Sequence, residues 1–479
     1  MSEPKTYLGQ KGYTVYKNSI SDTLYRSICE ELNVAPHVPK SMVKMIPFPI
    51  YRESSQKLYL PRYYGESKFG TPAEIQLTSG NNINLTFTGS LRDYQENIVN
   101  TYMSSIQNNR GGGLLEVPCG RGKTICALSI ISKLKTKTLV IVHKGFLLNQ
   151  WVERIEQFLP GARVGRIQGQ VCDIEDKDIV IGMLQSLSMK EYPYELFSSF
   201  GLTIVDEVHH IAAEVFVRSL FKIVTPCMLG LSATMQRKDG LSKVFKMFLG
   251  EIIYKEKREG TDNVIVHAHT FKTRDEDFNE MEYDFRGNPK YSTMISKLCN
   301  FVPRSEFILD IVEKLFKSNN KQQIMILAHN KSLLAYLHDA IELRKMATVG
   351  YYVGGMKEKD LKISETKQII IATYSMASEA LDIKTLTTLV MATPKTDVTQ
   401  SIGRILRAKH TQPIVIDIID EHDVFQKQYW KRYSYYKKEN YTVLKISGGN
   451  SSHHHEETDP EKTNTNPLHG TCFIKLTKS

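Results

Sequence analysis

The chain has 479 residues, of which 41% are hydrophobic and 24% charged, and its formal net charge of +10 gives a pI near 9.0. This length predicts two or three domains, and the composition argues against a chain that is disordered throughout. The basic balance favours an acidic partner, with nucleic acid ahead of a membrane surface.

The seven cysteines are scattered and never stand in a C-x-x-C pair. We therefore expect no zinc site or disulfide framework, and a reducing compartment. The N-terminus has no apolar targeting region, and no apolar run approaches the roughly 18 residues that a membrane span needs. These features predict a soluble intracellular protein with no membrane partner.

Residues 1–89 mix helical and strand-like patterns and are expected to form a small mixed α+β accessory domain that binds nucleic acid or a partner. From residue 90, short runs of Val, Ile and Leu alternate with longer amphipathic stretches. This alternation predicts βαβ units and a parallel sheet with helices on both faces over residues 90–255. The strand candidates are LLEV, TLVIVH, DIVIGM, LTIVDE and CMLGLSAT.

The alternation lapses in the charge-rich residues 256–300, which we interpret as a connector. It resumes over residues 301–425 with runs such as IMILAH, QIIIAT and IVIDII. The predicted fold class is therefore α/β, with two tandem parallel-sheet domains. Residues 426–479 are expected to form a short C-terminal extension, a basic and aromatic segment followed by a flexible tail.

The loop PCGRGKT at 118–124 follows the strand LLEV and precedes a helical pattern. Its glycines let backbone N–H groups curl around a phosphate at the helix N-terminus. Lys123 would reach the β- and γ-phosphates of ATP, and Thr124 would hold Mg²⁺. Val117 stands where the full pattern has glycine, so an ordinary glycine-rich turn is the alternative. The predicted phosphate loop comprises Pro118, Cys119, Gly120, Arg121, Gly122, Lys123 and Thr124.

The strand LTIV ends in DEVHH at 206–210, where two adjacent carboxylates repel unless a cation or a proton transfer uses them. Ligands of a parallel sheet lie beyond the carboxyl ends of its strands, so this pair is expected near the phosphate loop. Asp206 would then bind the Mg²⁺ that ATP shares with Thr124, and Glu207 would deprotonate the attacking water. His209 would sense the phosphate end. The alternative for the acidic pair is a strand that simply reaches the surface at Asp206, and the alternative for His209 is an ordinary loop histidine.

Four motifs occur in the order typical of superfamily 2 DExH-box helicases and translocases: PCGRGKT, DEVH, LSAT at 231–234 and QSIGRILR at 400–407. The chain resembles that family over about residues 90–420, which implies two RecA-like domains that close on ATP. The resemblance also implies that Ser232 and Thr234 couple hydrolysis to domain movement. Three residues of the second domain would complete the nucleotide site and stabilise transition-state charge: Gln400, Arg404 and Arg407.

Finer resemblances place the chain within the family. LRDYQ at 91–95 is similar to the adenine-reading element, with Gln95 on the base, and RKDG at 237–240 is similar to the DNA-repair and transcription branch that includes XPB and UvsW. ATYSMASEALDI at 372–383 resembles the segment that links nucleotide and nucleic acid and ends near Asp382, although Ala380 replaces the usual glycine. The N-terminal block is similar to helicases of large DNA viruses, including the poxvirus transcript-release helicase.

The nucleic-acid surface is harder to locate. The family contacts the sugar-phosphate backbone at positions matching 143–151, 165–169, 183–187, 329–333 and 351–357, each of which could equally be an ordinary loop. Residues 426–441 interleave aromatics with Lys and Arg, as single-strand stacking platforms do. The alternative is a helix that packs its aromatics onto the second domain.

We therefore expect an ATP- and Mg²⁺-dependent DNA helicase or translocase that acts in transcript release or in repair. One alternative is an RNA helicase, and another is an RNA-polymerase-associated component whose ATPase needs a partner. A P-loop kinase is disfavoured, because it would not need the second domain. The sequence leaves the oligomeric state open, and a monomer is compatible with it.

Overall fold

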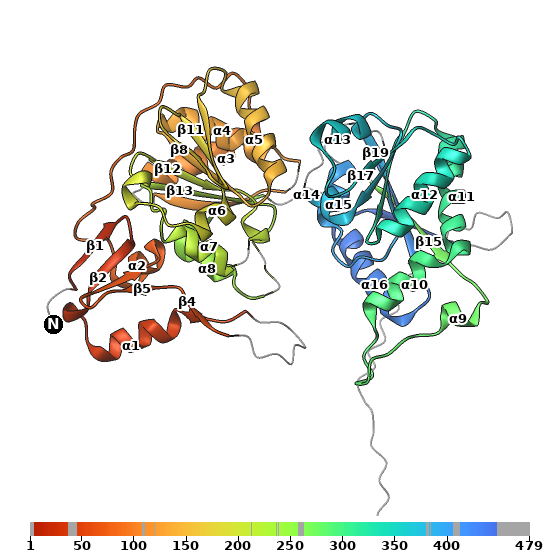
Figure 1. The fold of residues 1–479 in the computed structure, drawn as a ribbon, viewed down its shortest axis with the longest axis horizontal. Coiled ribbons are helices and arrows are strands. Elements are labelled where there is room, and N and C mark those ends of the chain that lie inside the picture. Colours follow the sequence, from red (N-terminus) through yellow and green to blue (C-terminus); the bar gives the residue numbers. More distant parts are fainter. Residues whose placement is uncertain are drawn as a thin grey trace, which may run out of the picture.

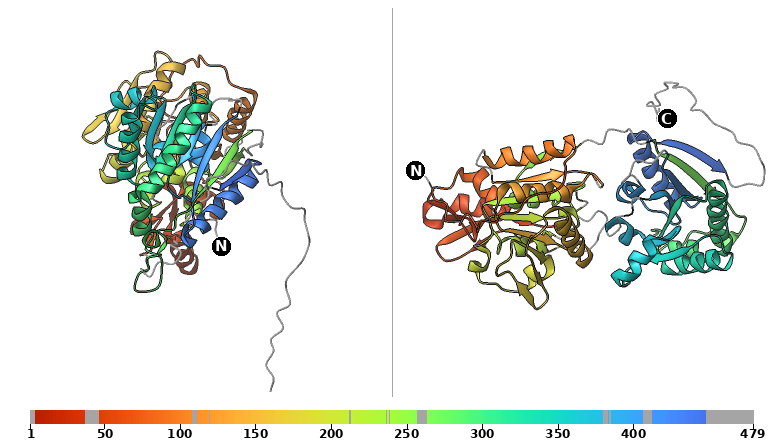
Figure 2. Two further views of the ribbon diagram at one scale, coloured as in Figure 1. Left: turned by 90° about the vertical axis from the view of Figure 1, so that its right-hand side faces the viewer. Right: turned by 90° about the horizontal axis from the view of Figure 1, so that it is seen from above.

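A computed structural model describes residues 4–36, 46–107, 111–118, 120–211, 213–235, 237, 239–256, 263–379, 383, 385–405 and 412–447. Two sheet domains lie side by side, and a smaller N-terminal domain packs against the first of them (Figure 1). The view from above places the N-terminal domain at the end of the molecule away from the second sheet domain (Figure 2).

The N-terminal domain is an antiparallel sheet with strand order β1-β2-β6-β5 and two helices. Its elements are β1 (Thr6–Gly9), β2 (Gly12–Tyr16), α1 (Asp22–Glu31), β3 (Asn33–Val34), β4 (Phe48–Pro49), β5 (Arg52–Glu53), β6 (Lys57–Leu60) and α2 (Arg62–Phe69). Helix α1 begins after Ser21, whose hydroxyl accepts a hydrogen bond from Leu24 N at 3.2 Å and so satisfies a first-turn donor.

The first sheet domain has strand order β10-β9-β11-β8-β12-β13-β7-β14 and is parallel except for the β9–β10 pair. Its strands are β7 (Gly112–Glu116), β8 (Thr138–Val142), β9 (Val164–Gln168), β10 (Val171–Asp173), β11 (Ile179–Met183), β12 (Leu202–Val205), β13 (Cys227–Ser232) and β14 (Ile252–Lys255). Its helices are α3 (Asp93–Gln107), α4 (Lys123–Leu134), α5 (Gly145–Phe158), α6 (Leu184–Met189), α7 (Ala213–Leu220) and α8 (Ser242–Leu249). One hydrophobic cluster joins the sheet to α3, α4 and α5, and another joins it to α6, α7 and α8.

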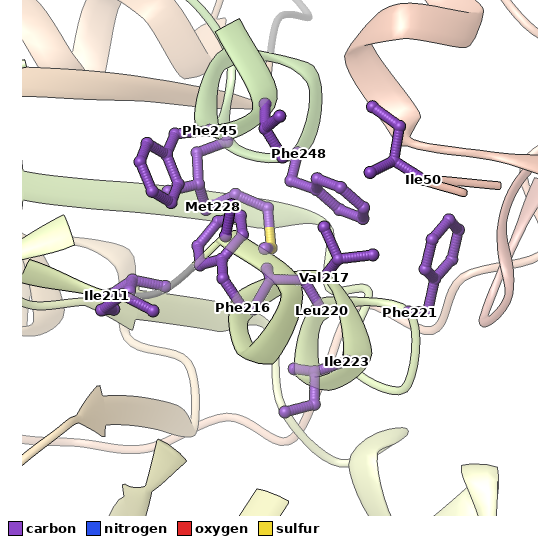
Figure 3. Packing of buried hydrophobic residues seen from close by; sticks show 14 of the residues in the cluster. Ile50, Ile211, Phe216, Val217, Leu220, Phe221, Ile223, Met228, Phe245 and Phe248 are labelled. Carbon is purple, nitrogen blue, oxygen red and sulfur yellow. The ribbon is translucent and has the colours of Figure 1, made fainter. Parts of the chain in front are cut away.

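The second cluster also holds the N-terminal domain in place. Ile50 of that domain lies in the same apolar cluster as Phe221, which follows α7 (Figure 3). On α2, Arg62 Nη1 donates to the carbonyl oxygens of Thr225 and Pro226 at 3.2 and 2.8 Å. Because a shared apolar core is costly to expose to water, this packing holds the two domains together.

The second sheet domain is wholly parallel, with strand order β17-β18-β16-β19-β20-β15-β21. Its strands are β15 (Ile265–Phe271), β16 (Gln323–Ala328), β17 (Val349–Tyr352), β18 (Ile369–Thr373), β19 (Leu386–Met391), β20 (Ile414–Asp420) and β21 (Thr442–Ser447). Its helices are α9 (Glu276–Asn279), α10 (Tyr291–Asn300), α11 (Val302–Ser318), α12 (Lys331–Leu343), α13 (Glu358–Glu365), α14 (Tyr374–Glu379), α15 (Thr399–Ile405) and α16 (Asp423–Lys438). The predicted α/β class with two tandem parallel sheets is thus confirmed.

The structure distributes three segments differently from the sequence analysis. Residues 81–89, assigned there to the N-terminal domain, pack on the first sheet domain through the buried Ile83 and Leu85. Strand β15 lies within the predicted connector and β21 within the predicted extension, yet both belong to the second sheet. They pair with each other across about 170 residues of chain, a contact that local sequence patterns do not reveal.

The two sheet domains touch through α5 and α13. Asn149 Nδ2 donates to Glu358 Oε2 at 2.7 Å, and Lys362 Nζ donates to Glu153 Oε1 at 2.6 Å. These groups are largely solvent-exposed, so each contributes at most about 1 kcal/mol to holding the domains together. Across the described ranges, no helix is both long and apolar enough to cross a membrane.

Candidate active site

The phosphate loop has the backbone that its glycines were expected to allow. Gly120 and Gly122 have φ values of +82° and +80°, in the left-handed region. Gln95 braces the loop, because its amide nitrogen donates to the Arg121 carbonyl at 3.1 Å while its amide oxygen accepts from Arg92 N at 3.0 Å. A Cβ on Gly122 would lie 2.3 Å from that amide nitrogen and displace it, and the φ of +80° strains any other residue here. The predicted loop residue Cys119 lies outside the described residues.

Arg121 anchors the loop on its outer side. Its guanidinium lies 4.0 Å from the Tyr94 ring centroid, and its Nε donates to Glu256 Oε1 at 2.7 Å. Glu256 follows β14, and α3 carries Tyr94, so the loop is attached to two neighbouring elements. Pro118 ends the strand side of the loop, and Thr124 stands in the first turn of α4, next to Lys123.

The two carboxylates follow β12, at the sheet edge where the loop also begins. Lys123 Nζ donates to Glu207 Oε1 at 2.9 Å, and both side chains are mostly buried. Glu207 has φ 48° and ψ 50°, a left-handed conformation that costs a non-glycine residue about 1–3 kcal/mol. In this conformation the Glu207 carboxylate contacts Lys123, so the phosphate loop and the acidic pair lie together as predicted.

Asp206 is almost fully buried at 5% exposure and accepts two hydrogen bonds. Its Oδ1 accepts from the Glu207 amide at 2.9 Å, and its Oδ2 accepts from Trp151 Nε1 at 2.8 Å. Burial and the neighbouring Glu207 charge raise the pKa of Asp206 to about 6. Burial also opposes ionisation of Glu207, but the Lys123 ammonium outweighs it and lowers the pKa of Glu207 to about 2. Lys123 therefore favours the charged form of Glu207, whereas burial and the Glu207 charge penalise that of Asp206.

Trp151 was missed by the sequence analysis, which placed it among nucleic-acid contacts. That prediction is wrong for this residue, because its side chain is 1% exposed. It lies on the buried face of α5 with Leu147, Leu148 and Ile155. The helical spacing of these four apolar residues could have identified it as a core residue.

His209 links the acidic pair to the end of β13. Its Nδ1 lies 2.7 Å from Ser232 Oγ and 3.4 Å from Glu207 Oε2. Ser232 Oγ also donates to the carbonyl oxygen of Thr234. Burial, partly offset by Glu207, lowers the pKa of His209 to about 3, so the ring is neutral at physiological pH. Hydrogen bonds therefore connect His209 to the LSAT segment, and His209 in turn lies beside the Glu207 carboxylate.

Arg237 of the RKDG motif holds the DEVHH loop in place. Its Nη1 donates to the carbonyl oxygens of His209 and Ile211 at 2.8 and 2.6 Å, and its Nε donates to Asp239 Oδ1 at 2.8 Å. In this structure the motif braces the DEVHH loop.

The predicted second-domain residues are only partly described. Helix α15 contains Gln400 and Arg404, whose side chains lie outside the described part of the chain, as do Arg407 and Asp382. The helix lies on the side of its domain that faces the first domain (Figure 1). It is held there by Ile402, which is fully buried.

The basic and aromatic segment 426–441 falls mostly within α16. Phe425, Tyr429, Arg432 and Tyr436 form its buried face, which supports packing onto the second domain rather than base stacking for these residues. Trp430 is 52% exposed on the opposite face.

The chain is similar to several known proteins. The family model described as "Type III restriction enzyme, res subunit" matches residues 88–237, which include the phosphate loop and the DEVHH and LSAT motifs. The protein of Acanthamoeba polyphaga mimivirus named "Putative ATP-dependent RNA helicase L396" is 36% identical over 456 residues, covering 92% of this chain and 87% of its own. The African swine fever virus protein QP509L, with the same descriptive name, is 27% identical over 423 residues, covering 81% of this chain and 80% of its own.

Among solved structures, the crystal structure of T4 UvsW is 19% identical and covers 93% of this chain and 99% of its own, with a TM-score of 0.35. The phosphate loop, DEVH, LSAT and QSIGRILR in this order on two parallel-sheet domains are the features of superfamily 2 helicases. The chain belongs to the family of viral ATP-dependent helicases of that superfamily that includes the mimivirus protein. It is accordingly an ATP-hydrolysing nucleic-acid helicase.

Proposed function

We propose that this helicase binds MgATP between the phosphate loop and the DEVHH loop and uses its hydrolysis to move along DNA. The observation that carries the proposal is the contact of Lys123 with Glu207, which joins the two loops. The fit to a triphosphate is supported by the left-handed Gly120 and Gly122 and by the start of α4 at this point, which turns backbone N–H groups toward a bound anion.

The site also suits a divalent cation. Glu207 Oε2 is buried and has no hydrogen-bond partner among the described residues, and Asp206 is a buried carboxylate. Thr124 and Asp206 would hold Mg²⁺, which would neutralise charge on the phosphates.

Glu207 is proposed as the general base. While Lys123 is paired with Glu207, the carboxylate oxygen nearest the loop is occupied. A γ-phosphate would compete for Lys123, because three phosphate oxygens offer it more charge than one carboxylate. Glu207 is thereby released to orient and deprotonate water only when ATP is bound.

His209, Ser232 and Thr234 are proposed to carry the result to the rest of the motor. Their hydrogen bonds link His209, whose Nδ1 lies 3.4 Å from Glu207 Oε2, to the LSAT segment at the end of β13. Gln400, Arg404 and Arg407 are proposed to complete the site from the second domain when the cleft closes. Arginines supplied in this way are worth about 10³–10⁵ in rate.

DNA is proposed as the substrate because RKDG and LRDYQ resemble DNA-directed relatives. RNA is the second candidate, since the mimivirus and African swine fever virus relatives carry RNA helicase in their names. An RNA-polymerase partner, with a role in transcript release, is a further part of the proposal. The net charge of +10 suits either nucleic acid.

The test is steady-state ATP hydrolysis, alone and with single-stranded DNA, duplex DNA or RNA, at two salt concentrations. Stimulation by DNA that fades with salt supports the proposal, whereas stimulation by RNA alone overturns the DNA assignment. No stimulation by any of them would favour a component that needs polymerase, and copurification would then be measured.

The catalytic assignment is tested with Lys123→Ala, which we expect to abolish turnover. Lys133→Ala is the matched control, because Lys133 is an exposed lysine on the last turn of the same helix. Undiminished turnover in Lys123→Ala would refute the site.

A further inference from the structure

The segment Ala392–Thr393–Pro394–Lys395 joins the end of β19 to α15, which carries Gln400 and Arg404. It follows β19, and although the Ala392 N–H still donates to the Leu327 carbonyl at 2.9 Å, the carbonyl groups of the segment need partners of their own. Each of the four successive carbonyl oxygens accepts a hydrogen bond from a side chain, and the four donors come from four different helices. We name these donors the carbonyl clamp: Tyr291, Arg304, Tyr374 and Arg432.

Arg304 and Arg432 are the charged members of the clamp. Arg304 Nη1 donates to the Ala392 carbonyl at 2.9 Å, and Arg432 Nη1 donates to the Lys395 carbonyl at 2.8 Å. Their side chains are 0% and 1% exposed. Each is fixed by two hydrogen bonds to one buried carboxylate, Arg304 to Asp420 at 2.6 and 2.8 Å and Arg432 to Asp417 at 2.9 Å for both.

The two tyrosines complete the set. Tyr374 Oη donates to the Thr393 carbonyl at 2.6 Å, and Tyr291 Oη makes a longer contact of 3.4 Å to that of Pro394. His329 adds a further restraint, since its backbone N–H donates to Thr393 Oγ1 at 3.0 Å. The segment is therefore held along its whole length before the chain enters α15.

Stability alone does not account for two buried ion pairs in one small region. Replacing a buried pair by apolar residues of similar volume is often neutral or stabilising, because desolvation offsets the attraction. What a bidentate arginine supplies is direction, since its planar fork fixes the position of the carbonyl that its remaining nitrogen contacts. Arg304 contacts the first carbonyl of the segment that leads to α15, and Arg432 contacts the last.

We propose that Arg304 and Arg432 are positioning residues for ATP hydrolysis, which set the placement of α15 and hence of Arg404 toward the nucleotide. This inference rests on the proposed role of Arg404. A misplacement of about 1 Å in a catalytic group can cost up to about a hundredfold in rate. It also gives a function to Arg432 of the basic segment, which the sequence suggested as a stacking platform.

The test uses the full chain and the variants Arg432→Lys and Tyr374→Phe. Lysine keeps the charge beside Asp417 but cannot make all three hydrogen bonds, and phenylalanine removes only a hydroxyl. We expect kcat for ATP hydrolysis with saturating nucleic acid to fall about tenfold or more in Arg432→Lys and several-fold in Tyr374→Phe. The affinity for a fluorescent ADP analogue, which reports on the first domain, should stay within about twofold.

The control for loss of a buried arginine is Arg62→Lys, since Arg62 also donates to two carbonyl oxygens but lies in the N-terminal domain. Its kcat should be unchanged. Equal falls in kcat in the Arg62 and Arg432 variants, or an unchanged kcat in both clamp variants, would overturn the inference.

Arg404→Ala separates failure of the inference from failure of the proposed function. If Arg404→Ala retains full kcat, the proposed role of Arg404 fails, and the clamp inference fails with it. If Arg404→Ala is inactive while the clamp variants are not, only the inference fails. The double variant Arg404→Ala with Arg432→Lys should be no slower than Arg404→Ala alone, because Arg432 acts through Arg404.

Discussion

Replacement of Trp151 by phenylalanine tests the support of the proposed cation site. The Trp151 side chain is 1% exposed, and its indole Nε1 donates to Asp206 Oδ2 at 2.8 Å. Phenylalanine keeps most of the apolar contact but removes this donor. A hydrogen bond to a charged group is worth about 1.5–3 kcal/mol, or about ten- to a hundredfold in an equilibrium.

We therefore expect Trp151→Phe to raise the Mg²⁺ concentration for half-maximal ATP hydrolysis by about ten- to a hundredfold. This magnitude agrees with the usual cost of removing the partner of a metal-binding carboxylate. The assay is a Mg²⁺ titration at fixed ATP, with thermal unfolding measured in parallel to show that the variant is folded.

The matched control is Trp430→Phe, which changes the chain's other tryptophan at a position that is 52% exposed. Its Mg²⁺ dependence should be unchanged. In that variant Trp151 is the sole tryptophan, so its fluorescence should respond to MgATP. A Trp151→Phe enzyme with an unaltered Mg²⁺ requirement would refute the reasoning.

Two further predictions concern the phosphate loop and acid stability. Gly122→Ala should abolish binding of the ADP analogue, because its Cβ would meet the amide of Gln95 at 2.3 Å. The control is Gly161→Ala, which is also at positive φ but has open space around it. This variant should bind the analogue normally and lose about 1–2 kcal/mol of stability. Burial, with His267 nearby, lowers the pKa of His269 to about 4. The histidine therefore binds a proton near pH 6.5 in the unfolded chain but stays neutral in the folded chain until about pH 4. The free energy of unfolding consequently decreases as the pH falls from about 6.5 to about 4. Between pH 7.5 and pH 5.0, the free energy of unfolding measured in urea should decrease by about 2 kcal/mol less in His269→Leu than in the parent protein. An equal decrease in both proteins would contradict this.

The site motifs were predictable because each is local. The loop at 118–124 and the pair at 206–207 follow apolar strand patterns directly, and parallel strands deliver such residues to one edge of a sheet. The role of Gln95 on the adenine base stays a prediction, and in the structure its amide contacts the phosphate loop. The left-handed backbone of Glu207 had no sequence signal, since glutamate rarely adopts it.

The longest-range features could not be read from any window of sequence. Trp151 reaches Asp206 across 55 residues, and Arg304 reaches Ala392 and Asp420 across 88 and 116.

By itself, the sequence determined the α/β class, the order of the motifs and the chemistry of the phosphate loop, because these depend on residue types within a few positions of one another. Tertiary structure alone decided that β15 and β21 join the second sheet, that the N-terminal domain shares a core with the first, and that α16 faces inward. The physical reason is that a buried polar or apolar group takes whichever complementary partner the packed fold brings within contact distance, and separation along the chain does not limit that choice.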